Sequence, residues 1–108
     1  MRIHHLALPD EWAAARDAGE YRVSTRGATL DEVGFIHGAT PDQVAGVRER
    51  YYADLDELVL LTIETDLLTS PWQLDEVGGQ WFPHVYGPIN LDAVVETGVT
   101  RSSHDTEA

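Results

Sequence analysis

The chain's clearest strand is the run ELVLLTIE at residues 57–64. Its middle is apolar on both faces, which is typical of a strand buried within a sheet. We therefore place this strand at the centre of a sheet and interpret the rest of the chain outward from it. The run IHHLAL at residues 3–8 predicts a short first strand, and residues 91–99 predict a helical turn followed by a last strand.

Three segments carry the residues that start and stop helices. PDEWAAARDAG at residues 9–19 has proline and acidic residues in its first turn and a glycine suited to a left-handed cap. TLDEVG at residues 29–34 fits a capping box and predicts one helical turn. TPDQ at residues 40–43 predicts a third helix that begins at the proline, with the threonine as its cap. Its apolar residues continue to Tyr51 at helical spacing, so we expect this face to pack on a sheet.

Glycine and proline delimit the remaining strands. GFIHGA at residues 34–39 predicts a short strand with a glycine at each end. Residues 72–77 and 80–86 predict a hairpin, because both residues between them are glycine. Pro83 inside the second of these strands indicates an edge position or a bulge. The order of elements predicts an α+β domain with antiparallel or mixed strand pairing.

The length of 108 residues fits a single domain. We expect this domain to span residues 1–99, followed by a polar, disordered tail over residues 100–108 that includes His104. No run approaches the roughly 20 apolar residues that cross a bilayer, and the first residues lack the apolar core of a signal peptide. The sequence therefore predicts a cytoplasmic protein without a membrane partner.

The chain is strongly acidic. It has seven basic and nineteen acidic residues, a net charge of −12, and it contains neither lysine nor cysteine. These absences exclude Schiff-base, thiol and disulfide chemistry and cysteine-ligated zinc. A negative field also repels phosphates, so direct binding of double-stranded nucleic acid is not expected. Seven carboxylates without an arginine lie in residues 54–76; we interpret them as a solvated acidic surface, with a cationic partner as the alternative.

Histidines are the main candidates for chemistry. His4 and His5 are adjacent on a strand and point to opposite faces, so only one of them can face a given site. His37 lies between glycines, where a ligand can approach the backbone, and His84 follows a proline at a rigid corner. Each of them, taken alone, is more often a hydrogen-bonded structural residue. Together, imidazoles from three separate strands can bind a metal, hold a polar ligand or transfer protons.

Four segments resemble, in this order, the small bacterial family known as domain of unknown function 952. They are IHHLA at residues 3–7 with Trp12, GFIH at residues 34–37 with Thr40, LVLL at residues 58–61, and FPHVYGPINL at residues 82–91. The resemblance covers about residues 2–96. It implies a compact ADP-ribosyltransferase-like fold with two small mixed or antiparallel sheets, a few short helices, and a cleft for NAD between the sheets.

The resemblance also implies roles for single residues in the first two motifs. His5 matches the first-strand histidine that contacts the cofactor ribose in active members of the fold, and His4 replaces a usual tyrosine. His37 matches the second-strand histidine, and the Thr40 hydroxyl is a nearby hydrogen-bond donor.

The third motif is matched by His84 and Tyr86, whose ring is a candidate to stack on the cofactor. Transferases of this fold often have a catalytic glutamate in this region; the third motif lacks one, and Asp75 is the nearest substitute. The candidates for contacting the cofactor phosphates are Arg2, Arg22 and Arg26.

The leading hypothesis is an enzyme that binds NAD or a related nucleotide and transfers or hydrolyses its ADP-ribosyl group. The catalytic candidates are His5, His37, His84 and Asp75, and the cofactor-binding candidates are His5, His37, Thr40 and Tyr86. A non-catalytic module that binds a nucleotide or another small ligand is the alternative, which an Asp75 pointing into solvent would favour. A histidine-ligated metal enzyme ranks last, because it needs three histidine nitrogens on one ion.

Overall fold

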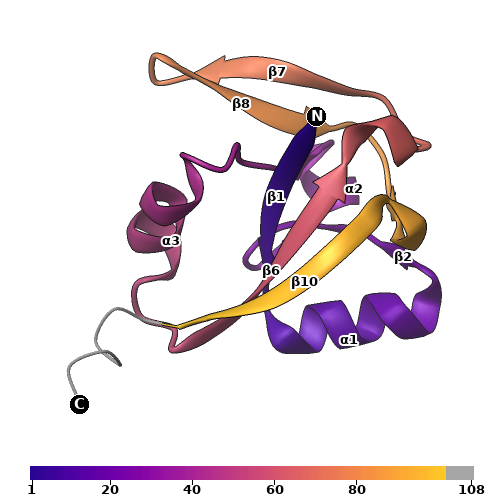
Figure 1. Ribbon diagram of the computed structural model, residues 1–108, viewed down its shortest axis with the longest axis horizontal. Coiled ribbons are helices and arrows are strands. Elements are labelled where there is room, and N and C mark those ends of the chain that lie inside the picture. Colours follow the sequence, from indigo (N-terminus) through magenta and orange to yellow (C-terminus); the bar gives the residue numbers. More distant parts are fainter. Residues whose placement is uncertain (102–108) are drawn as a thin grey trace.

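Two antiparallel sheets of three strands organise the protein (Figure 1). The structure is a computed structural model that describes residues 1–101. The first sheet has the order β1 (Arg2–Ala7), β6 (Glu57–Glu64) and β10 (Val94–Arg101). The second has the order β5 (Ile36–His37), β8 (Gln80–Val85) and β7 (Trp72–Val77). Shorter antiparallel pairs join β2 (Glu20–Tyr21) to β9 (Ile89–Asn90) and β3 (Val23–Thr25) to β4 (Ala28–Thr29).

Short helices connect these strands. They are α1 (Pro9–Ala18), α2 (Leu30–Val33) and α3 (Val44–Tyr52), with single 3₁₀ turns η1 (Thr65–Leu67) and η2 (Leu91–Ala93). In Figure 1, α1 runs along the lower end of the first sheet, and α3 lies on the left, below the β7–β8 hairpin. This arrangement confirms the predicted α+β architecture of small antiparallel sheets and a few short helices.

The strand β6 is the middle strand of the first sheet, as its apolar run predicts. Leu61 pairs with His5 of β1 on one side and with Thr97 of β10 on the other. Leu58, Leu61 and Ile63 are completely or almost completely buried. Burial of each such side chain stabilises the fold by about 1.5–3 kcal/mol.

The first two helices begin and end as their capping residues predict. α1 ends at Gly19, which has a left-handed φ of 90° and donates its N–H to the Ala15 carbonyl at 2.8 Å. At α2, the Glu32 N–H donates to Thr29 Oγ1 at 3.3 Å, and Glu32 Oε1 accepts the Thr29 N–H at 2.9 Å. These reciprocal bonds form the expected capping box.

The third helix begins at Val44, so the prediction that it begins at Pro41 is wrong. Gln43 Oε1 does accept the Thr40 N–H at 2.9 Å, which is one half of a capping box. The Thr40 hydroxyl, however, donates to Asp42 Oδ1 at 2.6 Å and does not cap a backbone N–H. Residues 41–43 therefore form a turn that precedes the helix.

Tyr52, and not Tyr51 as expected, anchors α3 to the first sheet. Tyr52 is buried and packs with Leu6 and Leu58 in a small second core. Tyr51 is 56% exposed and belongs to neither of the two buried clusters.

Pro83 lies in the middle strand of the second sheet and pairs in unbroken register with Leu74 of β7, so the prediction of an edge position or a bulge is wrong. Its carbonyl accepts the Gly38 N–H at 2.9 Å, so its backbone nitrogen also faces the side where β5 lies. Since β5 ends at His37, opposite His84, the missing N–H of Pro83 removes no bond from either neighbouring strand.

The last strand is longer than expected. β10 continues through Thr100, paired with Leu58, and Arg101, paired with Glu57. The Arg101 guanidinium also donates to Glu57 Oε2 at 2.8 Å. The strand therefore ends two residues beyond the expected residue 99, and residues 102–108 of the expected tail lie outside the described residues.

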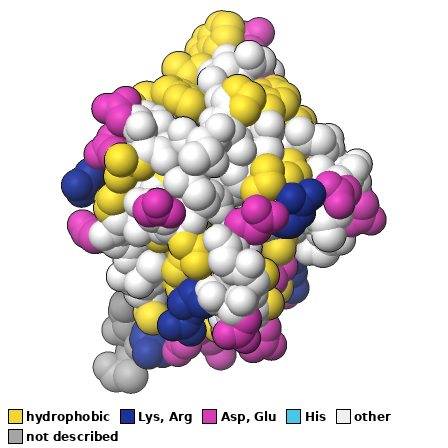
Figure 2. Space-filling view, turned by 90° about the vertical axis from the view of Figure 1, so that its right-hand side faces the viewer, with side chains coloured by type: hydrophobic (Ala, Val, Ile, Leu, Met, Phe, Trp, Pro, Cys, Tyr) yellow, Lys and Arg dark blue, Asp and Glu magenta, His cyan; other side chains and the backbone are white. Residues whose placement is uncertain are grey.

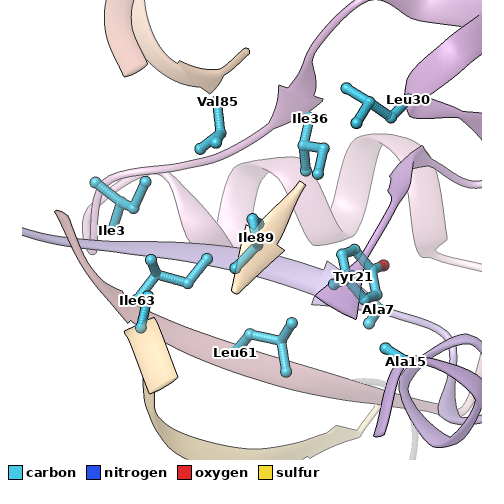
Figure 3. Packing of buried hydrophobic residues seen from close by; sticks show 11 residues of the cluster. Ile3, Ala7, Ala15, Tyr21, Leu30, Ile36, Leu61, Ile63, Val85 and Ile89 are labelled. Atoms are coloured by element: carbon cyan, nitrogen blue, oxygen red, sulfur yellow. The ribbon is translucent and has the colours of Figure 1, made fainter. Parts of the chain in front are cut away.

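The main core lies between the two sheets. Figure 3 shows Ile36 and Val85 of the second sheet on one side, Ile3, Leu61 and Ile63 of the first sheet on the other, and Ile89 between them. The full cluster of buried residues is Ile3, Ala7, Ala15, Tyr21, Leu30, Ile36, Leu61, Ile63, Val85, Ile89 and Ala93. This shared core holds the second sheet against the first.

On the face shown in Figure 2, acidic side chains are scattered and do not gather in one patch. Several of those between residues 54 and 76 have partners: Asp54 pairs with Arg26, and Glu64 pairs with the N-terminal amine and Arg2. Within residues 1–101, no helix has the length and apolar character needed to span a membrane.

Candidate functional site

A groove of about 760 Å³ lies between α3 and the β7–β8 hairpin, with β1 and β3 contributing to its lining. His5 of β1, His37 of β5 and His84 of β8 all line this groove, together with His4. The structure therefore brings together the three histidines that the sequence singled out.

The register of the second sheet explains how these side chains meet. His84 pairs with Gln73 of β7 on one side and with His37 of β5 on the other. Side chains that lie opposite each other in a sheet share a face, as do alternate residues of one strand. His37, His84 and Asp75 are therefore presented on the same face.

Asp75 holds His84 in a fixed orientation. The Nδ1–H of His84 donates to Asp75 Oδ2 at 2.7 Å, and the Tyr86 hydroxyl donates to the same oxygen. The Nε2 atom of His84 has no hydrogen-bond partner in residues 1–101. Because His84 lines the groove, this nitrogen is the one that a ligand there can reach.

Aromatic rings restrict the His84 imidazole further. Phe35 stacks on it with a centroid distance of 4.1 Å and an interplanar angle of 21°. The His37 ring meets it edge-on at 5.3 Å. His84 is 3% exposed, so its ring is clamped between neighbours and cannot rotate freely.

The charges of this cluster are set by its hydrogen bonds and by burial. The Tyr86 hydroxyl, more than any other neighbour, lowers the pKa of Asp75, which therefore stays ionised at neutral pH. The same bond raises the pKa of Tyr86. Burial, and secondarily the nearby His84, lowers the pKa of His37 and favours its neutral form.

His5 differs from His84, because both of its ring nitrogens form hydrogen bonds within the protein. Its Nδ1–H donates to the His37 carbonyl at 2.6 Å, and its Nε2 accepts the Tyr21 hydroxyl at 2.8 Å. Burial lowers the pKa of His5 to about 4, so the ring is neutral. No ring nitrogen remains to bind a ribose, and His5 instead ties β1 to β5 and β2.

Three further candidates lie close to the groove but do not line it. The Asp75 and Tyr86 side chains meet behind His84. The Thr40 hydroxyl is already used by Asp42. Asp75 nevertheless does not point freely into solvent, because it also accepts the Gln73 side-chain N–H at 2.6 Å.

The arginines named from the sequence are engaged in ion pairs. Arg2 pairs with Glu64 and Glu96, and Arg22 pairs with Glu20 and Asp31. Neither lines the groove. Arg26 does line it, but both of its terminal nitrogens bind Asp54, at 2.7 and 2.8 Å.

Two charged groove residues, Arg50 and Asp42, were missed by the sequence reasoning. Arg50 follows the apolar Val47 by three residues, so the two side chains share one helix face. This spacing is the feature of the sequence that could have predicted the position of Arg50. Asp42 is the one carboxylate residue that lines the groove in the described chain. The Thr40 hydroxyl lowers the pKa of Asp42, which keeps it ionised.

The metal-enzyme alternative finds no support in the structure. Within residues 1–101, no group of three histidine or carboxylate residues is arranged to hold a metal ion.

Comparison with known proteins identifies the family. The family described as Protein of unknown function (DUF952) matches residues 6–97. The chain belongs to this family. The match confirms the resemblance drawn from the four sequence segments. No curated protein matches this DUF952 chain.

Solved structures support the fold of this DUF952 member. It is similar to the crystal structure of protein CC0527 from Caulobacter crescentus, with 26% identity, a TM-score of 0.81, and coverage of 92% of this chain and 85% of that one. The solution NMR structure of the same protein gives 26% identity, a TM-score of 0.73, and coverage of 90% and 82%.

Proposed function

We propose that this DUF952 protein binds NAD or a related nucleotide in the groove and transfers or hydrolyses its ADP-ribosyl group. The proposal includes the ADP-ribosyltransferase-like fold that the sequence resembles. The observation that carries it is the Asp75–His84 pair: His84 lines the groove, one of its imidazole nitrogens is fixed by a carboxylate, and the other has no hydrogen-bond partner in residues 1–101.

His84 is suited to act as the general base. Cleavage of the ribosyl–nicotinamide bond leaves its electron pair on the departing nicotinamide, which becomes neutral, and leaves positive charge on the ribosyl carbon. A water or acceptor hydroxyl attacks that carbon and gives its proton to Nε2 of His84. Asp75 acts as a positioning residue, since it fixes the tautomer of His84 and stabilises the imidazolium that forms.

A developing positive charge on the ribosyl carbon is stabilised by a nearby anion. The sequence pointed to Asp75 for this role, but Asp75 binds the far side of His84. We assign the role to Asp42, because it is the groove-lining carboxylate within residues 1–101.

The second candidate is binding without turnover. It is favoured by His5, whose nitrogens are both engaged, and by Asp75 and Tyr86, which do not line the groove. A binding module and an enzyme differ in one measurable way, since the module retains NAD intact.

Titration of the full chain with NAD in a calorimeter, followed by chromatography for free nicotinamide, tests both candidates. The proposal predicts saturable binding and nicotinamide release that is lost in His84→Gln. Binding without release supports the module. Absence of any heat at millimolar NAD overturns both the enzyme and a module that binds NAD, and leaves only a module for another small ligand.

A further inference from the structure

Arg50 stands out among the groove residues because no carboxylate pairs with it in residues 1–101. It lies in α3 and lines the groove. Its guanidinium carbon sits 5.5 Å from the centroid of the Tyr51 ring. A cation–π contact of this kind holds the guanidinium by its face and leaves the N–H donors at its edge available.

The two neighbouring arginines are already occupied. Arg26 forms a bidentate pair with Asp54. Arg48 donates to four backbone carbonyls, those of Tyr52, Leu55, Asp56 and Thr100. Both therefore serve the fold. Within residues 1–101, Arg50 has no such hydrogen bond, although it belongs to the same helix as Arg48.

We infer that Arg50 is the phosphate-binding residue of the groove, and that α3 forms a subsite for the phosphorylated half of a nucleotide. The choice of a nucleotide rests on the proposed function. The phosphate itself is indicated by the guanidinium, whose planar fork of donors matches phosphate oxygens. With a net charge of −12, the protein repels phosphates in general, so one unpaired arginine in the groove has a large influence on anion binding.

Adenosine 5′-monophosphate and adenosine are the probes that test this subsite, because they differ only in the phosphate. Titration of the full chain in a calorimeter is expected to give an affinity about tenfold higher for the monophosphate, as for one partly exposed charge-assisted pair. Arg50→Gln is expected to remove this difference and to leave adenosine binding within about twofold of its original value.

Arg16→Gln is the matched control. Arg16 also has no carboxylate partner in residues 1–101, but it lines a separate shallow depression beside β10. This variant changes the net charge by the same amount and is expected to retain the preference for the monophosphate. An equal loss in both variants would mean that overall charge, and not the subsite, controls binding, and it would overturn the inference.

The inference and the proposed function fail in different ways. If wild-type protein binds neither probe, or prefers neither, or if Arg50→Gln keeps the preference, the Arg50 subsite is overturned even when NAD is cleaved. If Arg50 controls monophosphate binding but NAD is neither bound nor cleaved, the subsite stands and the proposed function falls.

Discussion

The two three-stranded sheets each place one buried histidine against the same groove, and they use it in opposite ways. In the first sheet, His5 has both ring nitrogens bonded within the protein. In the second sheet, His84 has one nitrogen bonded to Asp75 and the other without a partner in the described chain. The two residues have nearly the same exposure, 4% and 3%. Burial alone therefore does not separate a histidine with both ring nitrogens bonded from one that keeps a nitrogen available to a ligand, whereas the partner of the second nitrogen does.

The largest expected effect concerns His84. His84→Gln removes the proposed general base, and nicotinamide release from NAD is expected to fall by roughly 10²–10⁴-fold. NAD affinity, measured by calorimetry, should change by less than a few-fold, because the base acts mainly in the transition state. Asp75→Asn, which keeps the shape of the side chain, should lose less. Equal activity of His84→Gln and wild type would remove the proposed distinction between the two histidines.

The next effect concerns His5 and the dependence of stability on pH. An unfolded His5 has its ordinary pKa of 6.5, whereas in the folded protein its pKa is about 4. Between pH 4 and pH 6.5, His5 binds a proton in the unfolded chain but not in the folded protein. The free energy of unfolding should therefore be highest above pH 6.5 and fall by about 3 kcal/mol on acidification to pH 4. The lowered pKa of His37 acts in the same direction.

Urea denaturation between pH 8 and pH 4 measures this dependence. His5→Gln is expected to be less stable at neutral pH but to show a flatter profile, since the titrating group is gone. His84→Gln serves as the comparison. A profile as steep in His5→Gln as in wild type would show that other groups control the acid sensitivity.

A smaller effect is expected where the two sheets meet. A Cβ added to Gly38 would lie 2.9 Å from the Pro83 carbonyl oxygen and 3.4 Å from that of His4. Gly38→Ala should therefore lower the free energy of unfolding by about 1–2 kcal/mol. Gly46→Ala in α3 is the matched control: nothing lies within 4 Å, and alanine favours a helix, so it should raise stability by roughly 0.5–1 kcal/mol. Equal effects of the two substitutions would contradict the close approach at Gly38.

Local sequence patterns were sufficient for most elements. The apolar run of β6, the left-handed cap at Gly19 and the capping box at Thr29 all formed as predicted. Two of the wrong expectations have identifiable causes, one local and one that depends on tertiary context. Thr40 turned to the Asp42 carboxylate, which displaced the start of α3. Pro83 is tolerated in a middle strand because a neighbouring strand is only two residues long.

The candidate site was likewise predictable only where it depends on local sequence patterns. The two glycines of the hairpin fix its register, which pairs His84 with Gln73 and places Asp75 within reach of His84. The sequence named both residues as candidates but did not predict the hydrogen bond between them. The engagement of His5 by Tyr21, and the place of Arg50 at the groove, depend on how separate elements pack. No local pattern contains that information.

The smallest expected effect concerns Tyr86, whose hydroxyl binds Asp75, the partner of His84. Tyr86→Phe keeps the ring near Phe35 but removes the hydroxyl that most strongly lowers the pKa of Asp75. The pKa of Asp75 should rise, so Asp75 loses its charge at a higher pH and the acid limb of the rate profile shifts upward. Nicotinamide release at neutral pH should fall only about threefold, because His84 and its carboxylate partner remain. If Tyr86 instead stacked on the ligand, Tyr86→Phe would leave the profile unchanged and Tyr86→Leu would raise KM. A shifted profile with unchanged KM in both variants assigns Tyr86 to positioning.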